Sequence, residues 1–299
     1  MPTASRPHEA PAAAGPLVNP ISGERGPEPR EPITVRRYGS AGPSVVVLHG
    51  GPGAPGSVAD LAAALGTWFV VHEPLQRWSG IGRLTVARHV DDLVEVFPPG
   101  AMIVGSSWGA MLALSFAARH PSLPHAIALV GTGTYDAESR TVYAAEVAHR
   151  LGRRGRLTMH RLGQRLRQAR SRDERDQAFA EIGRLVANAQ GVGRIPSVEP
   201  GLPVDGRGYE ETWSDVLRLQ RNGVEPQSFA AIQAPVVMLH GDRDPHPGPL
   251  IRERLREVLP QLEYVELAGC GHEPWREAGA RETFLALLRD WLEAHAVRP

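Results

Sequence analysis

The chain has 299 residues, of which 42% are hydrophobic and 22% charged, so it can build a large core and is not globally disordered. Its 33 cationic residues balance 33 acidic ones, which argues against a whole-molecule electrostatic attraction to nucleic acid or to an anionic membrane. All 33 cations are arginine. The absence of lysine excludes a P-loop lysine, a Schiff-base lysine and a lysine general base.

Cys270 is the only cysteine, which excludes an internal disulfide and any multi-cysteine metal or iron–sulfur site. No apolar run approaches the ~20 residues needed to span a bilayer, and no secretory leader is visible at the N-terminus. We therefore expect a cytoplasmic protein without a membrane partner.

The predicted elements begin after a tail. Residues 1–32 are rich in Pro, Ala and Gly and predict a flexible N-terminal segment. From residue 33 onward, short apolar runs alternate with helical patterns, which is typical of a parallel sheet with crossover helices. Strands are predicted at 33–38, 45–48, 68–71, 101–104 and 126–130, and helices at 57–65, 85–97 and 108–119. The alternation returns with strands at 235–239 and 262–267 and helices at 250–258 and 277–295.

Residues 133–232 interrupt this rhythm. They predict several helices joined by Gly- and Pro-containing loops, with no buried strand. An insertion of this length usually forms a lid over a functional face. We therefore predict an α/β core over residues 33–132 and 233–299, with a helical cap over residues 133–232.

Four of the predicted strands end in polar or glycine-rich turns. In a parallel sheet the carboxyl ends of the strands lie at one edge, where ligands bind. The turns span residues 49–53, 105–109, 240–244 and 268–272. The sequence therefore predicts that Ser107, Asp244 and His272 converge, although they are far apart in the chain.

Residues 105–109, Gly-Ser-Ser-Trp-Gly, fit the pattern G-x-S-x-G between an apolar strand and an apolar helix. Glycines on both sides permit a sharp turn that exposes the hydroxyl of Ser107 as a nucleophile. The backbone N–H of Trp108 then points from the helix N-terminus toward a developing oxyanion. Residues 49–53, His-Gly-Gly-Pro-Gly, offer the second oxyanion donor, for which we favour Gly51 over Gly50.

His272 follows the last predicted strand and completes the chain order Ser…Asp…His of a hydrolase triad. A histidine there can act as general base toward Ser107. Asp242 and Asp244 both follow the preceding strand. We favour Asp244 as the carboxylate that orients His272, because it lies further into the loop, and keep Asp242 as the alternative or as a turn cap.

On these motifs, the sequence from about residue 33 to 295 resembles the α/β-hydrolase superfamily, and within it the proline iminopeptidase group. The resemblance implies an α/β-hydrolase fold, a mostly parallel sheet flanked by helices with an inserted cap. It implies catalysis by Ser107, Asp244 and His272, with an oxyanion hole formed by Gly51 and Trp108. The implied reaction is hydrolysis of an ester or amide bond in a small molecule or short peptide, with no cofactor, metal or nucleic acid.

Two features depart from the iminopeptidase pattern. The Asp-Gln-Arg-Gly type segment is replaced by Glu73-Pro74-Leu75-Gln76-Arg77-Trp78-Ser79-Gly80, in which only the Gln-Arg pair survives. In addition, no motif assigns the cap residues Glu146, Glu210 or Glu211 to the binding of a substrate amine. In this superfamily the same triad also supports C–C bond hydrolysis, lactone opening and perhydrolysis, and a non-catalytic ligand-binding protein is a further alternative.

Other features of the sequence have a simpler structural interpretation. Residues 140–175 hold eleven arginines against three acids, which is typical either of the solvated face of a cap helix or of attraction for RNA, an acidic partner or an anionic substrate. The helical spacing of Met159, Leu162 and Leu166 favours the solvated face. Cys270 lies between glycines in a tight turn, and Trp78 and Trp275 are candidates for the pocket wall. The sequence leaves the substrate and the oligomeric state open.

Overall fold

The computed structural model describes residues 32–198 and 202–297. All but the last residue of the predicted tail, 1–32, lie outside the described residues. The strands are β1 (Val35–Tyr38), β2 (Ser44–Leu48), β3 (Val70–Pro74), β4 (Met102–Ser106), β5 (Ile127–Val130), β6 (Val236–Gly241) and β7 (Leu262–Leu267). The α-helices are α1 (Ala59–Leu65), α2 (Val86–Val96), α3 (Trp108–Arg119), α4 (Ala137–Gln168), α5 (Arg172–Gln190), α6 (Gly206–Arg221), α7 (Gly248–Arg256) and α8 (Arg281–His295), and short 3₁₀ helices are η1 (Gln227–Ala231) and η2 (Pro274–Arg276).

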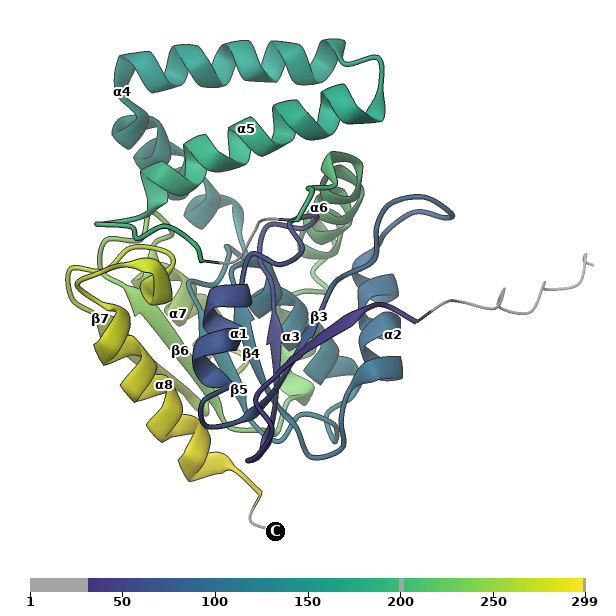
Figure 1. The fold of residues 1–299 in the computed structure, drawn as a ribbon, viewed down its shortest axis with the longest axis vertical. Helices are drawn as coiled ribbons and strands as arrows, with labels where there is room; N and C mark the ends of the chain where they lie inside the picture. The colour runs from purple at the N-terminus through teal and green to yellow at the C-terminus, as the bar shows by residue number, and fades with distance from the viewer. Residues whose placement is uncertain (1–31, 199–201, 298–299) are drawn as a thin grey trace, which may run out of the picture. The chain divides into compact units, whose positions relative to one another are not determined.

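The strands form one seven-stranded sheet in the order β1-β3-β2-β4-β5-β6-β7 (Figure 1). All neighbouring strands pair in parallel except β1, which runs antiparallel to β3 at the edge. The strand order reverses between β2 and β4, because β3 lies on one side of β2 and β4 on the other. Ligands of open α/β sheets bind at such a switch point, beyond the carboxyl ends of the strands. The topology therefore confirms the predicted fold class.

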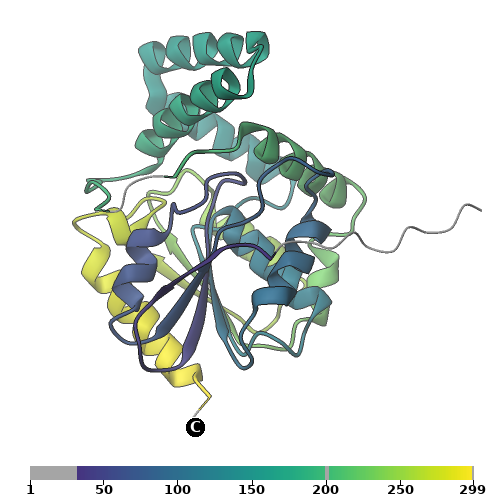
Figure 2. The same ribbon diagram turned by 45° about the vertical axis from the view of Figure 1, so that its right-hand side comes forward.

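The sheet is buried on both faces, which is why its central strands are continuously apolar. Val46, Leu48 and Ile103 belong to a core cluster with residues of α2, α3 and α7. The alternate strand residues, such as Val45 and Val47, belong to a second cluster with residues of α1 and α8. Figure 2 shows these two groups of helices on opposite sides of the sheet.

Most predicted elements are observed, with shifted ends. The third strand begins at Val70, two residues later than predicted, because Phe69 still donates its N–H to Leu65 at the end of α1 (3.0 Å). The last helix begins at Arg281 and not at residue 277. The carboxylate of Glu277 instead accepts the backbone N–H of Gly271 (2.6 Å), and it thereby supports the turn that carries His272.

Helices α4, α5 and α6 lie between β5 and β6, within the residues predicted as the cap. Figures 1 and 2 show α4 and α5 side by side beyond the carboxyl edge of the sheet. Gly152 interrupts α4 with φ 59° and ψ −171°, so two helical segments meet at a kink. No helix among residues 32–198 and 202–297 is long and apolar enough to cross a membrane.

Candidate active site

Ser107 occupies a strained turn between β4 and α3. Its backbone has φ 54° and ψ −118°, and it is the one non-glycine residue with positive φ in the described part of the chain. A methyl group on Gly105 would lie 2.3 Å from the carbonyl oxygen of Gly109, and one on Gly109 would lie 2.2 Å from that of Leu48. Only glycine fits at both positions. The G-x-S-x-G pattern therefore forms the sharp strand-to-helix turn that the sequence predicts.

The glycine-rich turn after β2 lies directly beside the serine. A methyl group on Gly50 would come 3.1 Å from Cβ of Ser107, whereas one on Gly51 would meet nothing within 4 Å. Gly50, Gly51 and Trp108 all line the same cavity as Ser107. The two loops that carry the predicted oxyanion donors therefore both line the cavity beside Ser107.

Gln76 joins these two loops. Its side-chain oxygen accepts a hydrogen bond from Nε1 of Trp108 (2.8 Å), and its Nε2 donates to the carbonyl of His49 (3.2 Å). Its backbone N–H donates to Nε2 of His49 (3.3 Å). Burial lowers the pKa of His49 to about 4, so this imidazole is neutral and its Nε2 can accept. In the sequence Gln76 is only part of the surviving Gln-Arg pair, because nothing local shows that its side chain reaches both loops.

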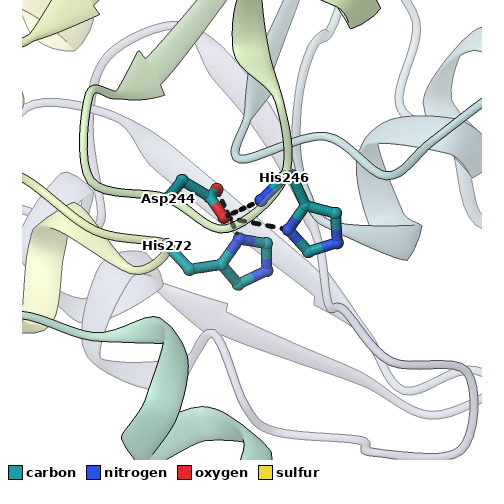
Figure 3. A group of neighbouring side chains, drawn as sticks. All are labelled: Asp244, His246 and His272. Carbon is teal, nitrogen blue, oxygen red and sulfur yellow. Dashed lines mark hydrogen bonds and ion pairs between the residues drawn. The ribbon is translucent and has the colours of Figure 1, made fainter. Parts of the chain in front are cut away.

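His272 and Asp244 form a buried hydrogen-bonded pair (Figure 3). Nδ1 of His272 lies 2.7 Å from Oδ2 of Asp244. Burial by itself would lower the pKa of His272, but the adjacent carboxylate and its hydrogen bond raise that pKa above its ordinary value. Burial by itself would raise the pKa of Asp244, but the surrounding imidazoles hold it well below its ordinary value. Asp244 is therefore an ionised acceptor for the ring of His272.

Asp242 has a different place. Its Oδ1 accepts the backbone N–H of Cys270 (3.2 Å), and its side chain is one-third exposed. It therefore caps the turn before His272, and the aspartate that the structure brings to the imidazole is Asp244. Cys270 is buried, and burial raises the pKa of its thiol. Its place in the turn matches the structural interpretation given from the sequence.

Ser107 and His272 line one cavity of about 1160 Å³ between the sheet edge and the cap. Both side chains line this cavity, but no direct hydrogen bond joins them in the part of the chain that the structure describes. Such contacts are often long before substrate binds and tighten in the complex. The cavity is largely walled by apolar side chains of the core and the cap: Met111, Phe179, Ile182, Val186, Ile195, Leu202, Val204, Tyr209 and Trp213.

Trp275 lines this cavity, whereas Trp78 does not. Trp78 lies 40% exposed beneath the guanidinium of Arg172. The three cap carboxylates are also absent from the cavity wall that the structure describes. Each has a cationic partner instead: Glu146 pairs with Arg150, Glu210 with Arg175 and Glu211 with Arg207.

His246 is a site residue that sequence reasoning missed. Its Nδ1 lies 2.9 Å from Oδ1 of Asp244, the oxygen not used by His272. Asp244, His246 and His272 each offer a potential metal-ligand atom within 4.8 Å of the others, a grouping that could hold a cation. Hydrogen bonds from two imidazoles to one carboxylate account for this proximity (Figure 3). The only feature of the sequence that pointed to His246 was its position two residues after Asp244.

A serine at a strained turn, facing a cavity that a carboxylate-bonded histidine shares, defines the site of an α/β-hydrolase. Residues 43–275 match the alpha/beta hydrolase fold family, so the chain belongs to this family and is a hydrolase. It is 28% identical over 268 residues to a pimeloyl-[acyl-carrier protein] methyl ester esterase of Chromobacterium violaceum, an alignment that covers 85% of this chain and 96% of that protein.

Solved structures share the fold. A thermophilic esterase from Thermogutta terrifontis is 18% identical, with a TM-score of 0.58 over 89% of this chain and 94% of the esterase. An enol-lactonase from Burkholderia xenovorans LB400 is 19% identical, with a TM-score of 0.57 over 87% of this chain and 96% of the lactonase.

Proposed function

We propose that the protein is a serine hydrolase of carboxylic esters, with Ser107 as nucleophile, His272 as general base and acid, and Asp244 as the orienting carboxylate. The observation that carries the proposal is the strained Ser107 turn on the cavity wall that it shares with a His272–Asp244 pair bonded at 2.7 Å. Strain of this kind costs of order 1–3 kcal/mol and persists where the surrounding structure imposes it.

In the proposed reaction, Oγ of Ser107 attacks the ester carbonyl carbon while Nε2 of His272 takes the hydroxyl proton. The tetrahedral oxyanion receives hydrogen bonds from the backbone N–H groups of Trp108 and Gly51 or Gly50. The C–O bond to the alcohol then breaks, and His272 gives its proton to the departing oxygen. A water molecule then attacks the acyl group on Ser107 while His272 takes its proton. The acid is released as His272 returns the proton to Oγ of Ser107, and Asp244 stabilises the imidazolium in both steps.

The decisive test is labelling of the purified protein with a fluorophosphonate probe, together with turnover of p-nitrophenyl esters. We expect Ser107→Ala to lose all labelling and to reduce kcat by about 10⁴-fold or more. Ser106→Ala is a matched control, because Ser106 belongs to β4 and its hydroxyl is not placed in the proposed reaction. Labelling of Ser107→Ala, or an unlabelled native protein that turns over no ester, would count against the proposal and favour a ligand-binding role.

The narrower proposal, a proline iminopeptidase, needs cap carboxylates to receive a substrate amine. Glu146, Glu210 and Glu211 point to this function only weakly, because each is paired with an arginine outside the cavity wall. We therefore expect cleavage of simple esters without release of proline from a proline–chromophore amide. Release of proline at a rate similar to that of ester cleavage would restore the peptidase proposal.

A second candidate substrate is an acyl ester carried on an acidic protein. Six arginines of α4 and the turn after it are exposed and form no ion pair in the described part of the chain: Arg153, Arg154, Arg156, Arg161, Arg167 and Arg170. The Chromobacterium violaceum relative is named for an acyl-carrier protein substrate. Exposed cations attract an acidic partner and are screened by salt.

The test compares the same acyl ester free and on a carrier protein. We expect the triple variant Arg153→Glu, Arg154→Glu, Arg161→Glu to lose activity on the carrier-borne ester alone, and added salt to have the same effect. Arg289→Glu on α8 is the matched control. Native activity of the triple variant on both the free and the carrier-borne ester would assign these arginines to the solvated face of the helix.

A further inference from the structure

Asp244 accepts hydrogen bonds from two imidazoles and not one. Its Oδ2 faces Nδ1 of His272 at 2.7 Å, and its Oδ1 faces Nδ1 of His246 at 2.9 Å. The backbone N–H of His246 donates to the same Oδ1 at 2.9 Å. Each oxygen of the carboxylate is therefore held from a different side (Figure 3). The reaction described above uses only His272, so the second imidazole needs its own account.

Ring stacking and a backbone hydrogen bond also fix the position of His246. Its ring stacks on His272 with centroids 4.6 Å apart, and on its other partner, Tyr143 of α4, at 4.1 Å. Its carbonyl oxygen lies 2.9 Å from Nε2 of His240, a buried residue of β6. A tyrosine from the cap thus rests on an imidazole that contacts both members of the acid–base pair. The ring has little freedom to rotate away from Asp244.

The protonation of His246 defines its role. Burial lowers its pKa to about 4, so the ring is neutral near pH 7. A neutral imidazole has one N–H, and its contact with an ionised carboxylate requires that proton on Nδ1. His246 is therefore a neutral donor to Asp244, and it places no second positive charge beside His272.

We propose that His246 is a positioning residue of this site, whose Nδ1–H fixes the rotation of the Asp244 carboxylate and keeps Oδ2 aligned on His272. This inference rests on the proposed function for its kinetic consequence. Without the imidazole donor, Oδ1 of Asp244 keeps only the backbone N–H of His246, so the carboxylate can tilt and its alignment on Nδ1 of His272 is lost. Small misplacements of a catalytic group can cost about a hundredfold in rate.

Two variants separate the hydrogen bond from the ring stack. His246→Asn keeps a side-chain N–H close to the position of Nδ1 but removes the ring. His246→Phe keeps the ring between Tyr143 and His272 but removes the donor. We expect kcat for a p-nitrophenyl ester to fall roughly ten- to a hundredfold in His246→Phe with KM little changed, and clearly less in His246→Asn. His160→Phe, an exposed substitution on α4, controls for the loss of a histidine.

The second readout is the titration of the His272 ring by NMR, with its signals assigned by their absence in His272→Gln. The other titratable groups close to the Asp244–His272 pair are His240 of β6, Tyr264 of β7, Cys270, Glu273 and Glu277 after β7, and Tyr143 of the cap. None of them is changed in these variants. A carboxylate that has lost its alignment on Nδ1 stabilises the imidazolium less, so we expect the pKa of His272 to fall by about half a unit in His246→Phe. In His246→Asn it should move less.

An unshifted His272 titration in His246→Phe would overturn the proposal. So would a loss of kcat in His246→Asn that equals or exceeds the loss in His246→Phe, since the Nδ1–H donor would then not set the alignment. The proposed function fails differently. A native protein that turns over no ester and takes no fluorophosphonate label refutes the serine hydrolase. The titration shift of His272 would still report whether His246 positions Asp244.

Discussion

The loops at the sheet edge and the helices of the cap are built in opposite ways. The first ten residues of α3, which begins directly after Ser107, are all buried. By contrast, the 32-residue α4 buries only Ser139, Val147 and Leu162, and α5 buries only Ala178. The site loops are fixed by core packing and hydrogen bonds, whereas α4 and α5 bury few side chains. Of the three cap helices, α6 is the one that joins the core, through Val216 and Leu219.

This difference assigns separate tasks to the two regions. The proposed chemistry depends on distances of a few tenths of an ångström, and it takes place where many packing contacts and hydrogen bonds fix the backbone. The cap supplies apolar cavity walls and an arginine-rich surface, and under the proposed function these are the features that would select the substrate. Substitutions in the loops should therefore reduce kcat for every substrate, whereas substitutions in the cap should change which substrate is preferred.

The largest expected effect separates the two aspartates. Asp244→Asn removes the charge that stabilises the imidazolium of His272 and disturbs its tautomer, so we expect kcat to fall by about 10⁴-fold. Asp242→Asn keeps a side-chain oxygen for the N–H of Cys270 and should lose far less. Steady-state kinetics on one p-nitrophenyl ester decides between them, and the reverse order of losses would exchange the roles of the two residues.

Gln76→Leu tests whether a residue outside the proposed triad controls the oxyanion loops. It leaves Nε1 of the buried Trp108 without its acceptor and releases the carbonyl of His49. We expect kcat to fall roughly ten- to a hundredfold with KM little changed, because the oxyanion donors lose their fixed spacing. Gln164→Leu, an exposed substitution on α4, is the control. Native kcat in Gln76→Leu would show that the loops hold their geometry without it.

The pH profile tests the electrostatics of the pair. His272 accepts the Ser107 proton only when neutral, and its pKa lies above the ordinary value of 6.5. We therefore expect kcat/KM to fall about tenfold per pH unit below that pKa, with a midpoint above 6.5. Asp244 stays ionised over this range, because its pKa lies well below 3.8. An acid limb with a midpoint below 6.5 would contradict the dominant effect of Asp244.

The smallest effect is expected in the cap. Val186 of α5 lines the cavity, so Val186→Trp should occupy space needed by a long acyl chain. We expect kcat/KM for a long-chain p-nitrophenyl ester to fall about five- to tenfold while that for the acetate is retained. Val142→Trp, on the exposed side of α4, is the matched control. Equal losses on both esters would show that the cap also supports the chemistry.

The sequence predicted the elements and loops that carry Ser107, Asp244 and His272 because these depend on local patterns. An apolar strand followed by G-x-S-x-G specifies its own turn, and α3 and β7 have the predicted ends. Strand order and the convergence of the loops follow from the general behaviour of parallel sheets.

Contacts between distant segments were beyond such reasoning. Gln76 joins two loops that are 27 and 32 residues away from it in the chain, and His246 meets Tyr143 from a different part of the fold. Glu146–Arg150 and Glu211–Arg207 follow the i,i+4 spacing of one helix, which the sequence allows. By contrast, the pairing of Glu210 with Arg175 of another helix depends on helix orientation, which composition does not specify. Side-chain partners of this kind become visible only when the tertiary packing is known.

The cap leaves the sheet after β5 and returns at β6, and these two strands are direct neighbours, with Ile127 beside Val236 and Val130 beside Leu239. Because the two strands run parallel, the chain leaves at the carboxyl end of β5 and re-enters at the amino end of β6, about 10 Å further along the strands. The hydrogen bonds between β5 and β6 are made by these two strands alone, so their register does not depend on the length of the chain between them. An insertion placed in this way can change in length and sequence while the hydrogen bonds of the sheet beneath it stay as they are.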